Sequence, residues 1–230
     1  MTFLTIGHRG VMGVEPENTL RSYLRAERSG MDVIALDLRL SKDGALVALH
    51  DPEVDRTTDG SGAVADLTLA ELRGLDAGQG EHVPVFEEVL DAVRAPLQVS
   101  VREHPAVRPL AELLLRRDLT ARVEVASFDD EALDEVARLV PGVRTTLYAD
   151  RPQAARRPLV DRALAIGAGT VALDIRELPL ATVEDVHAAG LRVVGREVDT
   201  LDLLRLARAL GLDGVVTRFP EIRSTGRFTA

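Results

Sequence analysis

The chain contains no cysteine among its 230 residues. It therefore has no disulfide bond, no thiolate metal site and no thiol nucleophile, and the redox compartment is left open. No apolar run approaches the roughly 20 residues that cross a bilayer, and the opening stretch MTFLTIGHRG shows no basic leader before an apolar core. These absences predict a cytoplasmic, soluble protein without a membrane span.

Basic residues are outnumbered, with 28 Lys and Arg against 37 Asp and Glu and a net charge of -9. This balance gives no electrostatic reason to expect nucleic acid or an anionic membrane as a partner. An anionic small molecule must therefore be held by a local group of cations. The sequence does not indicate the oligomeric state.

No Pro-, Ser- or Gly-rich linker and no run of charge divides the chain. A hydrophobic fraction of 46% with 28% charged residues is typical of a globular protein that buries a sizeable core. We therefore expect one domain over residues 1–230.

Apolar, β-branched runs alternate with amphipathic helical patterns. The runs predict strands at 3–7, 33–38, 45–50, 97–101, 123–127, 143–147, 170–174, 191–195 and 213–217. Helical patterns lie between most of them, at 18–30, 105–117, 131–140, 182–190 and 201–211. This alternation predicts a parallel sheet, and about eight such units favour a closed (β/α)8 TIM barrel over a doubly wound open sheet.

Nine predicted strands are one too many for an eight-stranded barrel. Residues 38–45 are too few for a parallel crossover, which takes about a dozen or more. If residues 41–44 form a hairpin turn, the pairing places Ala35 opposite His50. If both runs are barrel strands, their ends still lie side by side, so Ala35, Asp37 and His50 are neighbours in either case.

Polar side chains gather where the first three predicted strands end. His8 and Arg9 follow the first strand, Asp37 lies at the end of the second, and His50 and Asp51 end the third. The chemistry of such barrels sits at the carboxyl ends of the strands. A lone histidine is more often structural, but paired imidazoles can serve as general acid and general base near neutral pH. A neighbouring guanidinium can clamp a phosphate or carboxylate.

Several motifs follow one another along the chain: GHRG (7–10), PENT (16–19), LDLRLSKDGALVALHD (36–51), RTTDGSG (56–62), LTLAELRGLDAG (67–78), VPVFEEVL (83–90), SFD (127–129) and GLDGVVTRFP (211–220). In order and spacing they resemble the glycerophosphodiester phosphodiesterase family. The resemblance implies a barrel of the PLC-like phosphodiesterase type, a divalent cation such as Ca²⁺ or Mg²⁺, and cleavage of glycerophosphodiesters to glycerol 3-phosphate and an alcohol. It also implies an acid/base role for His8 and His50, phosphate binding by Arg9 and metal ligation by Asp37.

Two positions depart from the family pattern. Members carry Glu-x-Asp at the end of the second strand, and Ala35 stands at the glutamate position here. Another glutamate normally comes from the fourth strand, where this chain has Ser100 followed by Arg102. Because carboxylates supply most of the affinity for a hard cation, the pattern predicts a weak or absent metal site at Asp37.

Three arginines are predicted to bind the substrate anion where the metal is weakened, namely Arg9, Arg102 and Arg196. A shifted metal site at Glu197 or Asp174 is the alternative. Two other functions stay open: a metal-independent enzyme of a small-molecule pathway that uses the same histidines, and a non-catalytic protein that binds phosphate esters. Glu17 and Asn18 are expected either to cap the first helix or to shape the site.

Overall fold

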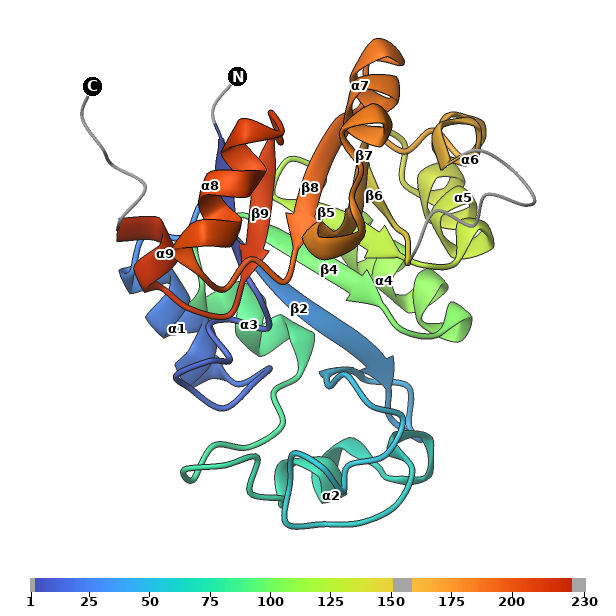
Figure 1. Ribbon diagram of the computed structural model, residues 1–230. Coiled ribbons are helices and arrows are strands. Elements are labelled where there is room, and N and C mark those ends of the chain that lie inside the picture. Colours follow the sequence, from blue (N-terminus) through green and yellow to red (C-terminus); the bar gives the residue numbers. More distant parts are fainter. Residues whose placement is uncertain (1–2, 151–158, 225–230) are drawn as a thin grey trace.

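The computed structural model describes residues 3–150 and 159–224. Its strands form a closed barrel (Figure 1), because β1 pairs in parallel with both β2 and β9. The parallel strands are β1 (Leu4–Gly7), β2 (Val33–Leu40), β4 (Leu97–Val101), β5 (Val123–Ser127), β6 (Arg144–Tyr148), β7 (Thr170–Asp174), β8 (Arg192–Arg196) and β9 (Gly214–Thr217). The predicted (β/α)8 barrel is confirmed, and the open-sheet alternative is wrong.

The ninth predicted strand is a hairpin partner of β2. β3 (Leu46–Ala48) runs antiparallel to β2, with Leu38 opposite Ala48. The Ser41 amide donates to the Ala45 carbonyl at 2.9 Å, and Gly44 has a φ of +81°. This turn is one residue longer than the expected one, so the predicted pairing of Ala35 with His50 is wrong by one position.

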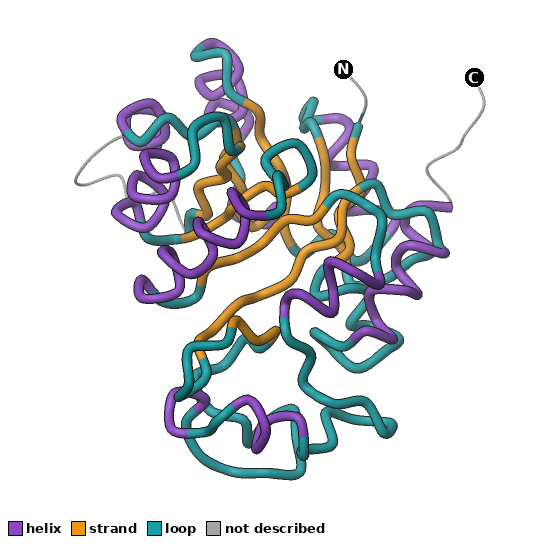
Figure 2. Tube along the Cα trace, turned by 180° about the vertical axis from the view of Figure 1, so that it is seen from behind, coloured by secondary structure: helices purple, strands orange, loops and turns teal. Residues whose placement is uncertain are grey.

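Helices surround the barrel (Figure 2). They are α1 (Leu20–Arg28), α2 (Leu69–Arg73), α3 (Phe86–Ala92), α4 (Val107–Arg116), α5 (Asp130–Leu139), α6 (Leu159–Ala165), α7 (Leu180–Ala188), α8 (Leu201–Ala209) and α9 (Glu221–Ser224). Short 3₁₀ turns lie at Val64–Asp66, His104–Ala106 and Ile175–Glu177. Of the helices in the described part of the chain, none combines the length and hydrophobicity that a bilayer crossing requires.

Apolar side chains pack in two layers. The larger layer lies between the strands and the outer helices and includes fully buried residues such as Leu36, Phe86 and Leu110. The smaller one fills the barrel, since alternate residues of each strand point inward. Its members are Ile6, Ala35, Ala126, Tyr148, Ala172, Val194 and Val216. Several of these side chains are small, which leaves room above them for a cavity at the carboxyl ends of the strands.

The chain between β3 and α3 forms a separate unit beside the barrel. Figure 1 shows this segment, which contains α2, projecting from the carboxyl end of β2. It packs around an apolar cluster that it shares with β3 and the residue after it, whose members are Val47, Leu49, Val54, Val64, Leu72, Ala77 and Val83. We call residues 51–85 the insertion segment.

The loop after β1 is pressed tightly against α1. The Val11 amide donates to the Ser22 hydroxyl at 2.9 Å, and this hydroxyl donates to the Arg9 carbonyl at 3.0 Å. Gly10 has a φ of +82°, and a Cβ atom there would overlap the Ser22 side chain and backbone. The loop that presents His8 and Arg9 therefore requires glycine at this position.

Replacing Gly10 by alanine should destabilise the protein by about 2–5 kcal/mol. The left-handed backbone costs about 1–2 kcal/mol for a residue with a Cβ atom, and overpacking against Ser22 adds about 1–3 kcal/mol. Gly142 is the matched control, because its φ is +88° and no neighbouring atom lies within 4 Å of the position that a Cβ atom would take there. If urea unfolding showed that Gly10→Ala lowers the free energy of unfolding no more than Gly142→Ala does, this account would be wrong.

Candidate active site

A cavity of about 410 Å³ opens at the carboxyl ends of the strands. It brings together the predicted histidines, the three predicted arginines and Asp37, whereas the alternative metal ligand Asp174 lies outside its lining. The lining residues are His8, Arg9, Ala35, Leu36, Asp37, His50, Ser100, Arg102, Phe128, Tyr148, Asp150, Arg196, Glu197 and Val216. The residues are thus placed together, while their chemical roles stay predictions.

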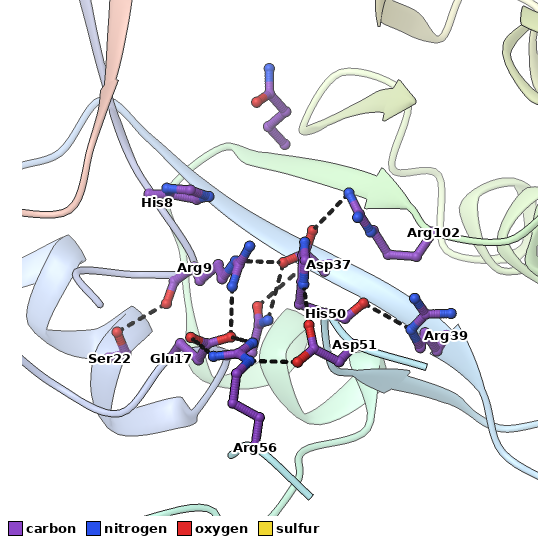
Figure 3. Close-up of polar contacts among 12 residues, drawn as sticks. His8, Arg9, Glu17, Ser22, Asp37, Arg39, His50, Asp51, Arg56 and Arg102 are labelled. Atoms are coloured by element: carbon purple, nitrogen blue, oxygen red, sulfur yellow. Dashed lines mark hydrogen bonds and ion pairs between the residues drawn. The ribbon is translucent and has the colours of Figure 1, made fainter. Parts of the chain in front are cut away.

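The Asp37 carboxylate lies near the centre of this group (Figure 3). Its side chain is 8% exposed, and the Arg9 Nε atom lies 3.0 Å from its Oδ2 atom. The Asn18 amide donates to the same oxygen at 3.2 Å, and Arg102 Nη1 lies 4.0 Å from Oδ1. A buried carboxylate is costly unless it is paired and hydrogen-bonded, so these cations balance Asp37.

Asn18 connects the first loop to β2. Its backbone has a φ of +55°, and its side-chain oxygen accepts from the Asp37 amide at 3.2 Å and from the Tyr23 hydroxyl at 3.0 Å. The capping alternative for Glu17 and Asn18 is wrong, because Thr19 is the N-cap of α1 and accepts from the Ser22 amide. Asn18 instead contacts Asp37.

The residues around Asp37 do not fit a hard divalent cation. Ala35 supplies no donor atom, Ser100 supplies only a neutral hydroxyl, and Asp37 is already bracketed by two guanidinium groups. Such ions take six or more oxygen ligands, with charged carboxylates prominent among them. No group of three or more His, Asp or Glu side chains suited to a metal ion occurs within residues 3–150 and 159–224.

The two alternative metal ligands, Asp174 and Glu197, contact other residues and not Asp37. The Asp174 carboxylate pairs with Arg176 at 2.5 Å and does not belong to the cavity lining. Glu197 does line the cavity, with a φ of +61°, and its Oε1 atom lies 3.7 Å from His8 Nδ1. These two residues therefore do not combine with Asp37 into a ligand set.

His50 is held by a carboxylate on the side away from its Nε2 atom. Its Nδ1 atom lies 2.5 Å from Asp51 Oδ1, and the other Asp51 oxygen lies 2.5 Å from Arg56 Nε. The hydrogen bond from Arg56, followed by that from His50, holds the pKa of the Asp51 carboxyl well below its usual range. Burial lowers the pKa of His50, although the charge of Asp37 and the contact with Asp51 oppose this.

His8 lies across the cavity and is more deeply buried. Among the described residues, its buried Nδ1 atom has no hydrogen-bond partner, and the Glu197 carboxylate is 3.7 Å away. Burial lowers the pKa of His8, and the Arg9 charge acts in the same direction, while Asp37 and Glu197 oppose it. Both imidazoles therefore favour their neutral forms near pH 7.

Two arginines on the later strands are stacked on aromatic rings. The Arg196 guanidinium lies 5.0 Å from the centre of the Phe128 ring and 5.4 Å from that of Tyr148, and Arg102 lies 6.0 Å from Phe128. Arg196 Nη2 donates to Asp150 at 2.7 Å. The Nε atoms of Arg102 and Arg196 are buried, and nothing in the described ranges hydrogen-bonds to them. Both arginines line the cavity and place a positive charge there.

Two aromatic residues and one arginine contribute to this site or its surroundings without having been predicted from the sequence. Phe128 comes from the SFD motif and Tyr148 ends β6, yet neither carried a recognisable chemical signal. The Tyr148 hydroxyl donates to Gln98 at 2.8 Å inside the barrel. Arg56 opens the RTTDGSG motif and contacts both Glu17 and Asp51, which no spacing along the chain indicated.

Comparisons with known proteins give the family. Residues 8–222 match the Glycerophosphoryl diester phosphodiesterase family. The glycerophosphodiester phosphodiesterase of Bacillus subtilis (strain 168) is 33% identical, over 95% of this chain and 84% of that protein. That of Caldanaerobacter subterraneus subsp. tengcongensis is 32% identical, over 96% of each.

The fold is shared with solved structures at similar coverage. An Oleispira antarctica phosphodiesterase, solved in complex with the product sn-glycerol-3-phosphate, superposes with a TM-score of 0.89 and 28% identity. The match covers 96% of this chain and 95% of that one. Since the family match spans nearly the whole barrel and the cavity, the chain belongs to the glycerophosphoryl diester phosphodiesterase family, whose members are hydrolases of phosphoric diesters.

Proposed function

We propose that the protein hydrolyses a glycerophosphodiester to glycerol 3-phosphate and an alcohol, using two histidines for proton transfer and arginines to hold the phosphate. One observation carries the proposal: His8, His50 and the guanidinium groups of Arg9, Arg102 and Arg196 line one cavity. The names of the relatives and the product bound to the Oleispira antarctica protein support the substrate class.

His50 is suited to the role of general base. The Asp51 carboxylate favours the tautomer that carries its proton on Nδ1, which leaves the Nε2 lone pair free to accept a proton from the attacking water. Asp51 also stabilises the imidazolium that forms in this step. A base oriented by a carboxylate in this way is a recurrent arrangement in hydrolases.

His8 is then the general acid. As the bond between phosphorus and the alcohol oxygen breaks, this oxygen needs a proton, and the imidazole of His8 is the second titratable group of the pair. The Asp37 and Glu197 carboxylates favour protonated His8 against the effect of burial. After turnover, the proton gained by His50 and the one lost by His8 are exchanged with solvent.

In this proposal the guanidinium groups bind the phosphate and balance its negative charge. Arg9 and Arg102 flank Asp37, and Arg196 lies against the Phe128 and Tyr148 rings. Guanidinium forks match phosphate oxygens and stabilise the charge that develops during the reaction. We therefore propose that hydrolysis proceeds without a tightly bound divalent cation, and that the family metal site is degraded at Ala35 and Ser100.

Leaving-group dependence tests the two histidine roles. We expect His8→Ala and His50→Ala each to lower kcat on glycerophosphocholine by roughly 10²- to 10⁴-fold. With a glycerol phosphodiester of p-nitrophenol, the His8→Ala loss should shrink by at least about tenfold, because this leaving group departs without a proton. The His50→Ala loss should be equal for both substrates. If the p-nitrophenol substrate restored more activity to His50→Ala than to His8→Ala, the acid and base roles of the two histidines would be reversed.

The pH dependence of kcat/KM follows from the lowered pKa values of both histidines. A reaction that needs one protonated and one neutral imidazole is fastest between the two pKa values of the free enzyme. Burial lowers both from the ordinary 6.5, so the maximum should fall below pH 6.5. For His8→Ala with the p-nitrophenol substrate, activity should instead rise with pH to a plateau, since only neutral His50 is needed. A native maximum above about pH 7 would contradict the paired roles.

Restoring the missing carboxylates tests the metal assignment. We expect native hydrolysis to withstand EDTA and calorimetry to find millimolar or weaker binding of Ca²⁺ and Mg²⁺, because two charged ligands are missing. Ala35→Glu combined with Ser100→Glu should make hydrolysis cation-stimulated by about tenfold or more and sensitive to EDTA.

The single variants are the controls and should respond little, because each leaves the ion short of one ligand. Loss of native activity in EDTA, or micromolar cation binding by the native protein, would show that other residues supply the ligands. A native protein that binds glycerol 3-phosphate without turnover, alongside an active double variant, would favour the binding-only alternative.

A further inference from the structure

Arg56 uses all three of its guanidinium nitrogens on the two carboxylates beside the cavity. Nη1 and Nη2 donate to the two oxygens of Glu17 at 2.9 and 2.8 Å, and Nε donates to Asp51 at 2.5 Å. Arg56 belongs to the insertion segment, whereas Glu17 belongs to the loop before α1. One side chain thus fastens two distant parts of the chain together (Figure 3).

Each of the two carboxylates also contacts a residue of the proposed machinery. Asp51 contacts His50 Nδ1 at 2.5 Å, and Glu17 Oε1 accepts from Arg9 Nη1 at 2.7 Å. The contacts therefore run without interruption from the His50 imidazole through Asp51, Arg56 and Glu17 to the Arg9 guanidinium. Glu17 is only 9% exposed, so its orientation is fixed by these two arginines.

We propose that Arg56 is a positioning residue that holds the base histidine and the phosphate-binding arginine in one register, through Asp51 and Glu17. The naming of those two roles rests on the proposed function, whereas the contacts themselves do not. Arg56 does not line the cavity and is not a catalytic residue.

The chemistry of the contacts requires arginine. A guanidinium presents its donors in a rigid fork, so it meets both oxygens of one carboxylate while its Nε reaches another. A lysine ammonium keeps the charge but cannot reproduce this geometry. Burial raises the pKa of Glu17, but the hydrogen bonds and charges of Arg56 and Arg9 together lower it. The hydrogen bond from Arg56 lowers the pKa of Asp51 as well, so both groups remain ionised acceptors.

Loss of Arg56 should change His50 in a defined direction. The groups that act on its imidazole are Asp51 by contact and Asp37, Arg9 and Arg102 by charge. Without Arg56, Asp51 accepts more strongly from His50, and a positive charge disappears from its surroundings. Both changes favour the imidazolium, so the pKa of His50 should rise.

The experiment compares Arg56→Met, Arg56→Lys and Arg117→Met with the native chain. Arg117 is the matched control, because it forms a part-exposed ion pair with Asp91 at 2.6 Å and does not line the cavity. For Arg56→Met we expect kcat/KM on glycerophosphocholine to fall about 10- to 100-fold, with kcat lowered through His50 and KM raised through Arg9. Circular dichroism checks the fold of each variant.

The His50 titration by NMR gives a readout that a merely structural role would not move. The chain has only five histidines, so the His50 resonance is identified by its loss in His50→Gln. Its pKa should rise in Arg56→Met, stay near the native value in Arg56→Lys, which keeps the charge, and not change in Arg117→Met. The raised KM should persist in Arg56→Lys, because the fork is lost.

Two outcomes would overturn the inference: a folded Arg56→Met variant with native kcat and KM, or an unchanged His50 pKa in that variant. If the native protein did not hydrolyse glycerophosphocholine, the proposed function would be refuted instead. The titration and the affinity for inorganic phosphate would still decide the role of Arg56, since neither depends on turnover. An Arg56→Met variant that fails to fold leaves Arg56→Lys to decide, through its raised KM or its weakened phosphate binding.

Discussion

The buried carboxylate of Asp37 determines how the charges of this cavity are arranged. A carboxylate that is 8% exposed must be paired, and Arg9, Arg102 and the Asn18 amide gather around it. In the sequence analysis, the family pattern predicted two further carboxylates at positions 35 and 100, where this chain has Ala35 and Ser100. The Asp37 carboxylate is balanced by guanidinium groups, and these same groups line the cavity.

The small interior of the barrel serves this arrangement. The interior carries small side chains at Ala35, Ala126 and Ala172, and Ala35 lines the cavity together with Tyr148, whose hydroxyl donates to Gln98. The rigid strands fix Asp37 beside Ser100, while the loops after β1 and β3 bring His8 and His50 to the same rim. The strands thus hold Asp37 in place, and short loops carry the two histidines that are proposed to transfer protons.

Much of this was readable in the sequence, for local reasons. The alternation of apolar runs with helical patterns predicted the barrel, and strand ends predicted the side chains at its rim, because parallel strands bring their carboxyl ends to one face. The hairpin of β2 with β3 was one of two alternatives, but its register depended on a turn at Gly44 that adopts a left-handed backbone. A single residue in a turn shifts every pair along the hairpin.

Contacts between distant segments were not readable in this way. The distance from Arg56 to Glu17 along the chain is 39 residues, and no periodicity reports a side chain that reaches across such a gap. The stacking of Arg196 on Phe128 and Tyr148 likewise depends on three different strand ends and on side-chain rotamers. Such contacts follow from the closed barrel, so they appear only once the fold is known.

The separate apolar cluster of the insertion segment has a consequence for how the site comes into being. The barrel closes through hydrogen bonds between its own strands, and these do not involve residues 51–85. The segment condenses around side chains such as Val54, Leu72 and Val83. A chain with a complete barrel but an undocked segment would therefore be folded by any measure of its sheet, while the contact of Arg56 with Glu17 had not yet formed. Local opening of the segment alone would remove this contact and leave the sheet intact, because proteins open locally in cooperative units.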